Sequence, residues 1–331
     1  MKHLHQPHDR FFRSAFGRAD LLRELLSDAL PPGLLQRLDL HALELSDESF
    51  VDPELAAHQS DILVRTRLRG SPLLVYVLVE HKSYPYRWTL LQLLRYMVAI
   101  WERERSRNPR ASTLPAVIPL IVYHGRRRWR FQVSFSGYFR PDKELAAFIP
   151  GFSSLLIDLR ERRNDPLNGS LQYQAALRAL QHAVTGLRPH LGEILRLLAA
   201  LPIEEEHRAF VSALLEYILR AGKDVEAGDL ETELQRVSSE AVREVYMTLA
   251  EKLMEQGKAQ GKLEGKLEGR LEGELEEKRQ VLLRLLGKKF GRLPPSSRRR
   301  ITDSRSREGL DRAIDLVLEV DSIELILKAI H

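Results

Sequence analysis

A chain of 331 residues with 44% hydrophobic residues can form one sizeable core and a smaller second domain. The absence of cysteine excludes disulfides and thiolate zinc sites and favours a reducing cytoplasm. No apolar signal core begins the chain and no apolar run is long enough to span a bilayer, so we expect a soluble, cytoplasmic protein without a membrane partner.

The first predicted element is an amphipathic helix over Phe11–Leu30, which ends at the pair Pro31-Pro32. Two strand-like runs follow, Ile62–Leu68 and Leu74–Val79, and the residues between them include Gly70 and Ser71, which favour a turn. These runs predict an antiparallel hairpin.

The register of this hairpin decides where its acidic residues lie. If Gly70 and Ser71 form a two-residue turn, paired residue numbers sum to 141, and Asp61 lies directly opposite Glu80 on the same face. Lys82 is two residues beyond Glu80 and shares that face. A loop longer by one residue would separate the two acids, unless a bulge restored the register.

Two carboxylates on one face suit a hard divalent cation such as Mg²⁺, which prefers oxygen ligands. A neighbouring lysine can orient or deprotonate water and offset charge on a phosphate. The alternative is an ordinary ion-paired end of a sheet. His81 lies between Glu80 and Lys82, so its ring is expected on the opposite face.

A second helix is predicted over Trp88–Arg107, with Gln92 and Tyr96 one turn apart on one face. Two more strands, Val117–Tyr123 and Leu155–Leu159, would complete the sheet. Asp158 in the last of these is a weaker site candidate, since an acidic residue at a sheet edge explains it equally well.

Positive charge is concentrated around this region. Residues 61–130 contain 14 lysines and arginines against 4 acidic residues, although the whole chain has a net charge of only +5. The arginines group at 65–69, 103–110 and 126–130. Such an excess beside a candidate metal site favours a nucleic-acid phosphate backbone, and the alternative is a solvated, charged surface.

The remainder of the chain is predicted to be helical and is divided into three parts. Residues 181–255 form a helical extension, and residues 256–277 are a spacer in which glycine recurs every four residues. Residues 278–331 form a small helical C-terminal domain, with a helix over Val281–Phe290, a loop at Pro294–Ser297 and a helix over Glu308–Val320.

The spacer repeats the pattern Gly-Lys-Leu-Glu with a period of 4, so each repeat turns by about 40° around an α-helix and no stripe stays on one face. Two interpretations remain open. The segment is either a charged, fraying helical spacer, which we favour, or a helix that packs on a partner through its glycines.

Several motifs together resemble a known family. Asp61 and the run Glu80-His81-Lys82 are similar to the PD-(D/E)XK nuclease superfamily, although Ser60 replaces the usual proline. The wider text resembles the Rpn family, the recombination-promoting nucleases, also named "YhgA-like putative transposases", over roughly residues 4–180. The matching segments are Pro7–Phe12, Glu48–Asp52, Ser60–Leu63, Val79–Ser83, Leu94–Met97 and Ile118–Gly125.

This resemblance implies an α/β, restriction-endonuclease-like core, a mixed sheet flanked by helices, over residues 1–180. It implies a metal-dependent DNA endonuclease that promotes recombination or mobility. Asp61, Glu80 and the backbone carbonyl of His81 would bind Mg²⁺, or else Mn²⁺ or Ca²⁺. Lys82 would activate water and Gln92 would support the site.

Other roles stay open. The first helix of the superfamily often contributes an acid, and Glu24 is the residue available for it, although a solvent-facing glutamate explains it as well. The alternative functions are a non-catalytic DNA-binding protein and an assembly protein. In the latter, the C-terminal helices would pair copies into a homo-oligomer.

Overall fold

The computed structural model describes residues 7–45, 62–71, 74–140, 144–162, 165–202 and 204–330. Contacts divide the chain into two compact units, Met1–Leu249 and Ala250–His331. The first unit contains all five described strands, and the second is built from helices.

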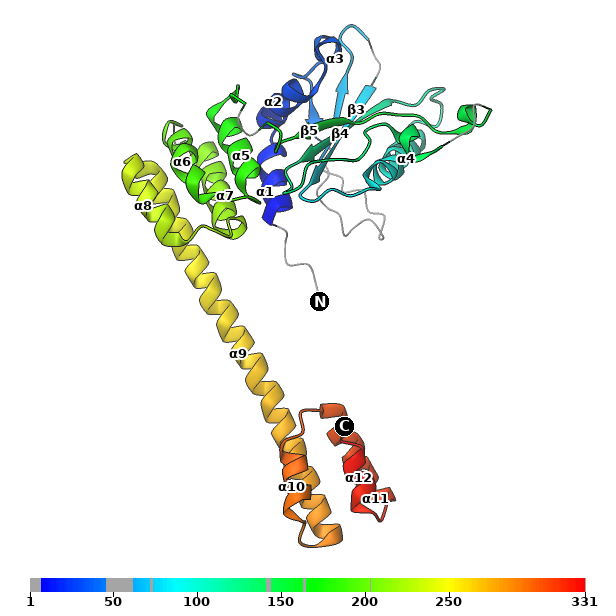
Figure 1. The fold of residues 1–331 in the computed structure, drawn as a ribbon, viewed down its shortest axis with the longest axis vertical. Coiled ribbons are helices and arrows are strands. Elements are labelled where there is room, and N and C mark those ends of the chain that lie inside the picture. Colours follow the sequence, from blue (N-terminus) through cyan, green and yellow to red (C-terminus); the bar gives the residue numbers. More distant parts are fainter. Residues whose placement is uncertain are drawn as a thin grey trace. The chain divides into compact units, whose positions relative to one another are not determined.

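The first unit is built on a mixed sheet with the strand order β1-β2-β3-β4-β5 (Figure 1). Strands β1 to β3 pair antiparallel, whereas β3, β4 and β5 run parallel. The strands are β1 (Glu44–Leu45), β2 (Ile62–Arg67), β3 (Leu74–Lys82), β4 (Ala116–Tyr123) and β5 (Leu155–Asp158). The class is therefore mixed α/β.

The predicted hairpin register is confirmed over the described residues. Ile62 pairs with Val79 and Arg67 pairs with Leu74, so paired numbers sum to 141 throughout β2. The alternation of side chains along β3 then fixes which residues face each side of the sheet. Asp61 and the turn residues 72 and 73 lie outside the described residues.

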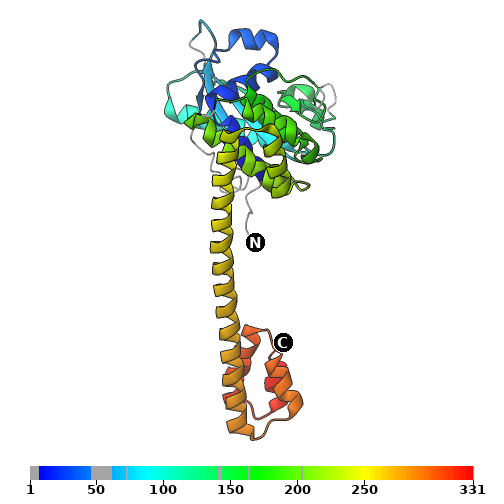
Figure 2. The same ribbon diagram turned by 90° about the vertical axis from the view of Figure 1, so that its left-hand side faces the viewer.

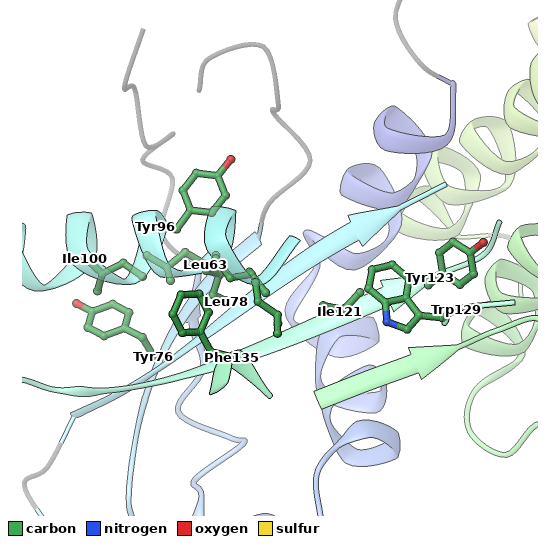
Figure 3. Close-up of a cluster of buried hydrophobic side chains, with 11 residues drawn as sticks. Leu63, Tyr76, Leu78, Tyr96, Ile100, Ile121, Tyr123, Trp129 and Phe135 are labelled. Atoms are coloured by element: carbon green, nitrogen blue, oxygen red, sulfur yellow. The ribbon is translucent and has the colours of Figure 1, made fainter. Parts of the chain in front are cut away.

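One face of the sheet is covered by α4 (Thr89–Arg107), in agreement with the helix predicted over Trp88–Arg107. Leu78 and Ile121 from the strands pack there with Tyr96 and Ile100 from α4, and Trp129 and Phe135 extend the same cluster (Figure 3). All of these side chains are buried, which anchors the helix against the sheet.

The opposite face is covered by α1 (Pro7–Phe16), whose Phe12 ring stacks on His81 of β3. The single helix predicted over Phe11–Leu30 is wrong, because α2 (Ala19–Ala29) is separate. The break follows from Gly17, where a Cβ atom would lie 2.4 Å from the Arg13 carbonyl oxygen. Apolar periodicity continues through this turn and therefore concealed it.

The helices of the first unit that follow β5 pack on α1, on α2 and on one another (Figure 1). Ser170 caps α5 by accepting a hydrogen bond from the Tyr173 amide. The bounds are α3 (Pro32–Arg37), α5 (Leu171–His182), α6 (Leu191–Ala199), α7 (Glu205–Ala221) and α8 (Ala227–Val237), with short 3₁₀ turns at Phe135–Tyr138, Ala146–Phe148 and Arg188–His190.

Helix α9 (Glu240–Phe290) contains the whole glycine repeat without a break (Figure 2). Open space surrounds the Cβ position of each glycine from Gly257 to Gly273, and Leu263, Leu267 and Leu271 are exposed. All residues from Gly257 to Gly273 are exposed, whereas at the end of the repeat Leu275 packs against the buried cluster of the second unit and Glu274 pairs with Arg307.

The C-terminal part of α9 packs with α10 (Pro295–Thr302), α11 (Arg307–Glu319) and α12 (Ile323–Lys328) (Figure 2). Leu282 and Leu286 of α9 share a buried cluster with Ile301, Leu310 and Ile326. The helix predicted over Glu308–Val320 is confirmed. The loop predicted at Pro294–Ser297 is wrong beyond its first residue, because Pro295 occupies the first turn of α10, a position that tolerates proline. None of the described helices is long and apolar enough to cross a membrane.

Candidate functional site

The end of β3 and the first turns of α4 bring three sequence-predicted residues together. Glu80 and Lys82 lie two residues apart on β3 and face α4, where Gln92 lies one turn before Tyr96. Glu80 is 0% exposed, and Lys82 and Gln92 are each 7% exposed. Charged side chains are rarely buried this deeply unless they are paired, so their partners determine the properties of the site.

These side chains form one connected network. Lys82 Nζ lies 2.5 Å from Glu80 Oε1 and donates a hydrogen bond of 3.1 Å to Gln92 Oε1. The Gln92 side-chain amide in turn donates to Glu80 Oε1 at 3.2 Å and to the Tyr96 hydroxyl at 3.2 Å. Gln92 therefore holds both the carboxylate and the ammonium group, and Tyr96 fixes the orientation of Gln92.

The second carboxylate oxygen of Glu80 is different. Glu80 Oε2 is fully buried and has no hydrogen-bond partner among the described residues. A buried oxygen without a partner is costly, and a bound cation would satisfy it. The carboxylate therefore fits a metal ligand on the side away from Lys82. Within the described ranges, no group of three or more acidic or histidine side chains is arranged to hold a metal ion.

The structure gives less information on the other two predicted metal ligands, Asp61 and the His81 carbonyl. Asp61 lies outside the described residues. The His81 ring faces away from Glu80, as alternation predicts, and its Nδ1 atom lies 3.0 Å from Asp9 Oδ1. This contact ties β3 to α1 directly behind the candidate site. Only the backbone of His81 is available to the Glu80 side of the sheet.

A histidine cluster occupies that opposite face. The His124 ring stacks on His81 and also lies against His8, with both ring centroids 4.7 Å away. His8 Nδ1 forms a hydrogen bond of 2.9 Å with the Tyr217 hydroxyl of α7. Burial, followed by the neighbouring His81, lowers the pKa of His8 to about 4, while Asp9 opposes this shift and Lys223 adds to it. Burial also holds the pKa of His124 well below 6.5, so both rings are neutral at pH 7.

The two weaker acidic candidates are not brought into this network. Both Glu24 oxygens accept hydrogen bonds at 2.6 Å from Ser170, one from its amide and one from its hydroxyl, which joins α2 to the start of α5. Asp158 accepts hydrogen bonds from the amides of Trp129 and Arg160 and so holds the loops that follow β4 and β5. Both carboxylates have structural partners.

One contribution was not apparent from the sequence, and a second was apparent only as a spacing. Asp9 contacts His81 across 72 positions of the chain, and no spacing rule connects them. Tyr96 was identified only by its spacing from Gln92, whereas the structure shows its hydroxyl accepting from the Gln92 amide. The only indication of a role for Asp9 in the sequence was that the run Pro7-His8-Asp9 lies in one of the segments that resemble the family.

Comparison with known proteins assigns the chain to a family. The model of the family described as "Putative transposase, YhgA-like" matches residues 6–220. The chain belongs to this family. Recombination-promoting nuclease RpnD of Escherichia coli O157:H7 is 30% identical over 250 residues, which cover 75% of this chain and 94% of that protein.

Other relatives differ in what their names state about activity. Recombination-promoting nuclease RpnA of Escherichia coli K12 is 26% identical over 255 residues, covering 76% of this chain and 85% of that protein. The "Inactive recombination-promoting nuclease-like protein RpnE" of the same strain is 25% identical over 254 residues, covering 76% and 82%. No solved structure matches.

Proposed function

We propose that this protein is a metal-dependent DNA endonuclease that hydrolyses phosphodiester bonds and promotes DNA recombination or mobility. Its first unit would be a restriction-endonuclease-like core of the PD-(D/E)XK type. The observation that supports this most is the buried network of Glu80, Lys82 and Gln92, in which one Glu80 oxygen has no partner among the described residues.

Glu80 and Asp61 would hold the cation, with the His81 backbone carbonyl as a third ligand. We expect Asp61 beside Glu80 because paired residues of β2 and β3 sum to 141, and these two residue numbers have the same sum. Mg²⁺ is the proposed ion, with Mn²⁺ and Ca²⁺ as alternatives. When bound, it would supply Lewis-acid stabilisation of the charge that develops during hydrolysis.

The other residues of the network have roles that their contacts support. Lys82 Nζ would orient the attacking water or accept its proton, since it is the donor closest to the Glu80 carboxylate. Gln92 would hold Lys82 and Glu80 in their relative positions. Its amide group can do this because it accepts from one and donates to the other.

The proposed DNA partner is supported by charge. The segment from residue 61 to residue 130, which includes β2, β3, α4 and β4, has 10 more basic than acidic residues. Such a surface binds phosphates independently of base sequence. We therefore expect binding without strong sequence preference and with a steep dependence on salt.

The test is cleavage of supercoiled plasmid by the full chain with Mg²⁺. We expect nicking or linearisation by the wild type and at least a 100-fold loss in Lys82→Ala, Glu80→Gln and Asp61→Ala, because positioned acid-base groups contribute about 10²–10⁴-fold. Glu24→Gln is the matched control, since its carboxylate is engaged by Ser170 outside the network. Equal activity in Lys82→Ala and wild type would overturn the proposal.

The second candidate is a non-catalytic DNA-binding protein, and the relative named as inactive at 25% identity favours it. It predicts that the wild type leaves plasmid intact with Mg²⁺, Mn²⁺ and Ca²⁺ at low salt, yet shifts DNA in a gel. Asp61→Ala would then have no effect on binding or on recombination in cells.

A further inference from the structure

A cavity of about 720 Å³ lies beyond the carboxyl ends of β3 and β4, within the first unit. Its walls come from the residues after these strands, from the end of α5 and from the end of α7. The volume falls in the range of about 300–1,000 Å³ that is usual for ligand sites. Ligands of α/β proteins also bind beyond the carboxyl ends of parallel strands, as β3 and β4 are here.

The cavity has an excess of positive charge. Arg126, Arg127 and Lys223 line it and are exposed, and none of these side chains has a hydrogen bond or ion pair with another described residue. The adjacent Arg128, by contrast, pairs with Glu161 and does not line the cavity.

The one carboxylate in the described lining has other partners. Asp224 accepts hydrogen bonds of 3.0 Å from the amides of Leu187 and Arg188, one on each oxygen. His8 also lines the cavity, and its ring is neutral at pH 7 because burial lowers its pKa. Three cationic side chains therefore face a single, already bonded carboxylate, which favours an anionic ligand.

The local backbone positions two of these cations. At Gly125 the chain passes so close to Tyr123 that a Cβ atom would lie 2.3 Å from its hydroxyl oxygen. The Tyr123 hydroxyl also donates a hydrogen bond to the Arg127 carbonyl oxygen. This turn directs the backbone of Arg126 and Arg127 over the end of β4, so that both residues reach the cavity.

The rim also offers an aromatic face. Tyr84 lines the cavity and is 52% exposed, so part of its ring is accessible to a ligand. An exposed tyrosine next to unpaired cations is the combination that binds an unstacked base together with its phosphate. Ser83, also in the lining, directly follows Lys82 in the chain.

We infer that this cavity binds a nucleotide unit, with the phosphate held by Arg126, Arg127 and Lys223 and the base stacked on Tyr84. The choice of a nucleotide over another anion rests on the proposed function. The ligand is either one nucleotide of a single-stranded DNA segment or a free nucleoside monophosphate, which have the same chemistry.

The experiment measures binding of a fluorescein-labelled 12-nucleotide oligothymidylate to the full chain by fluorescence anisotropy, in EDTA so that nothing is cleaved. The variants are the double change Arg126→Gln/Arg127→Gln, Lys223→Gln, Tyr84→Ala and Tyr84→Phe. Arg37→Gln/Arg243→Gln is the matched control, because it removes the same charge from exposed positions that do not line the cavity.

We expect the cavity double variant to bind at least about tenfold more weakly and to lower the salt slope by up to about 0.7, because the three cations hold one phosphate. Lys223→Gln should weaken binding and lower the slope by less than the double variant does. Tyr84→Ala should weaken binding about fivefold or more, and Tyr84→Phe should restore it to within about twofold. The control pair should change affinity less than about twofold.

Two further arms identify the source of the nucleotide. Competition by millimolar thymidine 5′-monophosphate would assign the cavity to free nucleotides. Weaker binding of a duplex of the same sequence, without competition by the mononucleotide, would assign it to a single strand. The inference would be overturned if the cavity variants bound the oligonucleotide as tightly as the wild type, or if their affinity fell no more than that of the control pair.

Plasmid cleavage separates this inference from the endonuclease proposal. If oligonucleotide binding depends on the cavity but plasmid stays intact, the endonuclease proposal fails and the cavity assignment stands. If plasmid is cut while the cavity variants bind normally, the cavity assignment fails alone.

Discussion

Replacing Lys82 and Glu80 separately and together gives the sharpest test of the buried network. Lys82→Met removes the ammonium group 2.5 Å from a carboxylate that is 0% exposed. An uncompensated buried charge of this kind costs about 3–5 kcal/mol of folding stability. Lys82→Met/Glu80→Gln removes both charges, so the double variant should recover most of that loss, although it should cut no DNA.

Urea unfolding followed by tryptophan fluorescence measures these differences. All three tryptophans, Trp88, Trp101 and Trp129, belong to the first unit, so the signal reports on the unit that contains the network. Far-UV circular dichroism of the same samples reports on both units and shows whether they unfold separately. Equal losses in the single and double variants would refute the argument, because they would mean that Glu80 does not depend on Lys82 for its charge.

Three further predictions follow from other parts of the chain. Because the pKa of His8 is held near 4 in the folded protein against 6.5 when unfolded, the unfolded chain takes up this proton first as the pH falls. The contribution of His8 to the free energy of unfolding should therefore be fully present above pH 6.5 and should fall by about 2 kcal/mol between pH 7.5 and pH 5. Urea unfolding of His8→Gln at these two pH values should show a pH dependence that is smaller by this amount. Tyr96→Phe removes the hydroxyl that orients Gln92, so it should lower the free energy of unfolding by only about 1 kcal/mol, for one lost hydrogen bond, and should also reduce plasmid cleavage. Unchanged cleavage would show that Lys82 and Glu80 suffice to orient Gln92. Gly265→Ala in the exposed repeat should raise helix stability by up to about 1 kcal/mol because nothing lies within 4 Å of the new methyl group, whereas Gly309→Ala should destabilise the second unit because its Cβ would lie 2.3 Å from the Ile330 carbonyl oxygen; thermal melts of both variants, followed by circular dichroism, compare them directly.

The hairpin shows what could be predicted from the sequence. On the condition of a two-residue turn at Gly70 and Ser71, the two apolar runs predicted the register, and Ile62 pairs with Val79 as that register requires. Period-2 alternation also separated the Glu80 side of β3 from the His81 side. These are local rules, and they hold because one shift of register would move every side chain of the strand to the other face of the sheet.

The network itself required tertiary information. Gln92 and Tyr96 were placed together by the spacing of one helical turn, but the contact of Gln92 with Lys82 depends on how α4 packs on the sheet. Similarly, the separation of α1 from α2 depends on one close approach at Gly17, which leaves no trace in the apolar pattern. Sequence patterns therefore did not give the contacts between elements or the break between α1 and α2.

The energetics of the network bear on whether it is structural or functional. A buried ion pair is weak evidence for stability, because well-packed apolar side chains of similar volume are often as stabilising. Here Glu80 Oε2 is also buried without a partner among the described residues. In a purely structural ion pair, such an oxygen would only lower stability. A cation bound at this oxygen removes that cost.

Binding of the cation should therefore appear as added stability even where no DNA is cut. At a Mg²⁺ concentration ten times its dissociation constant, the free energy of unfolding should rise by about 1.4 kcal/mol. Glu80→Gln should abolish this increment, whereas Glu24→Gln should retain it, because Ser170 already occupies both Glu24 oxygens. An increment that is the same in all three proteins would mean that Mg²⁺ acts elsewhere on the chain and that Glu80 is not its ligand.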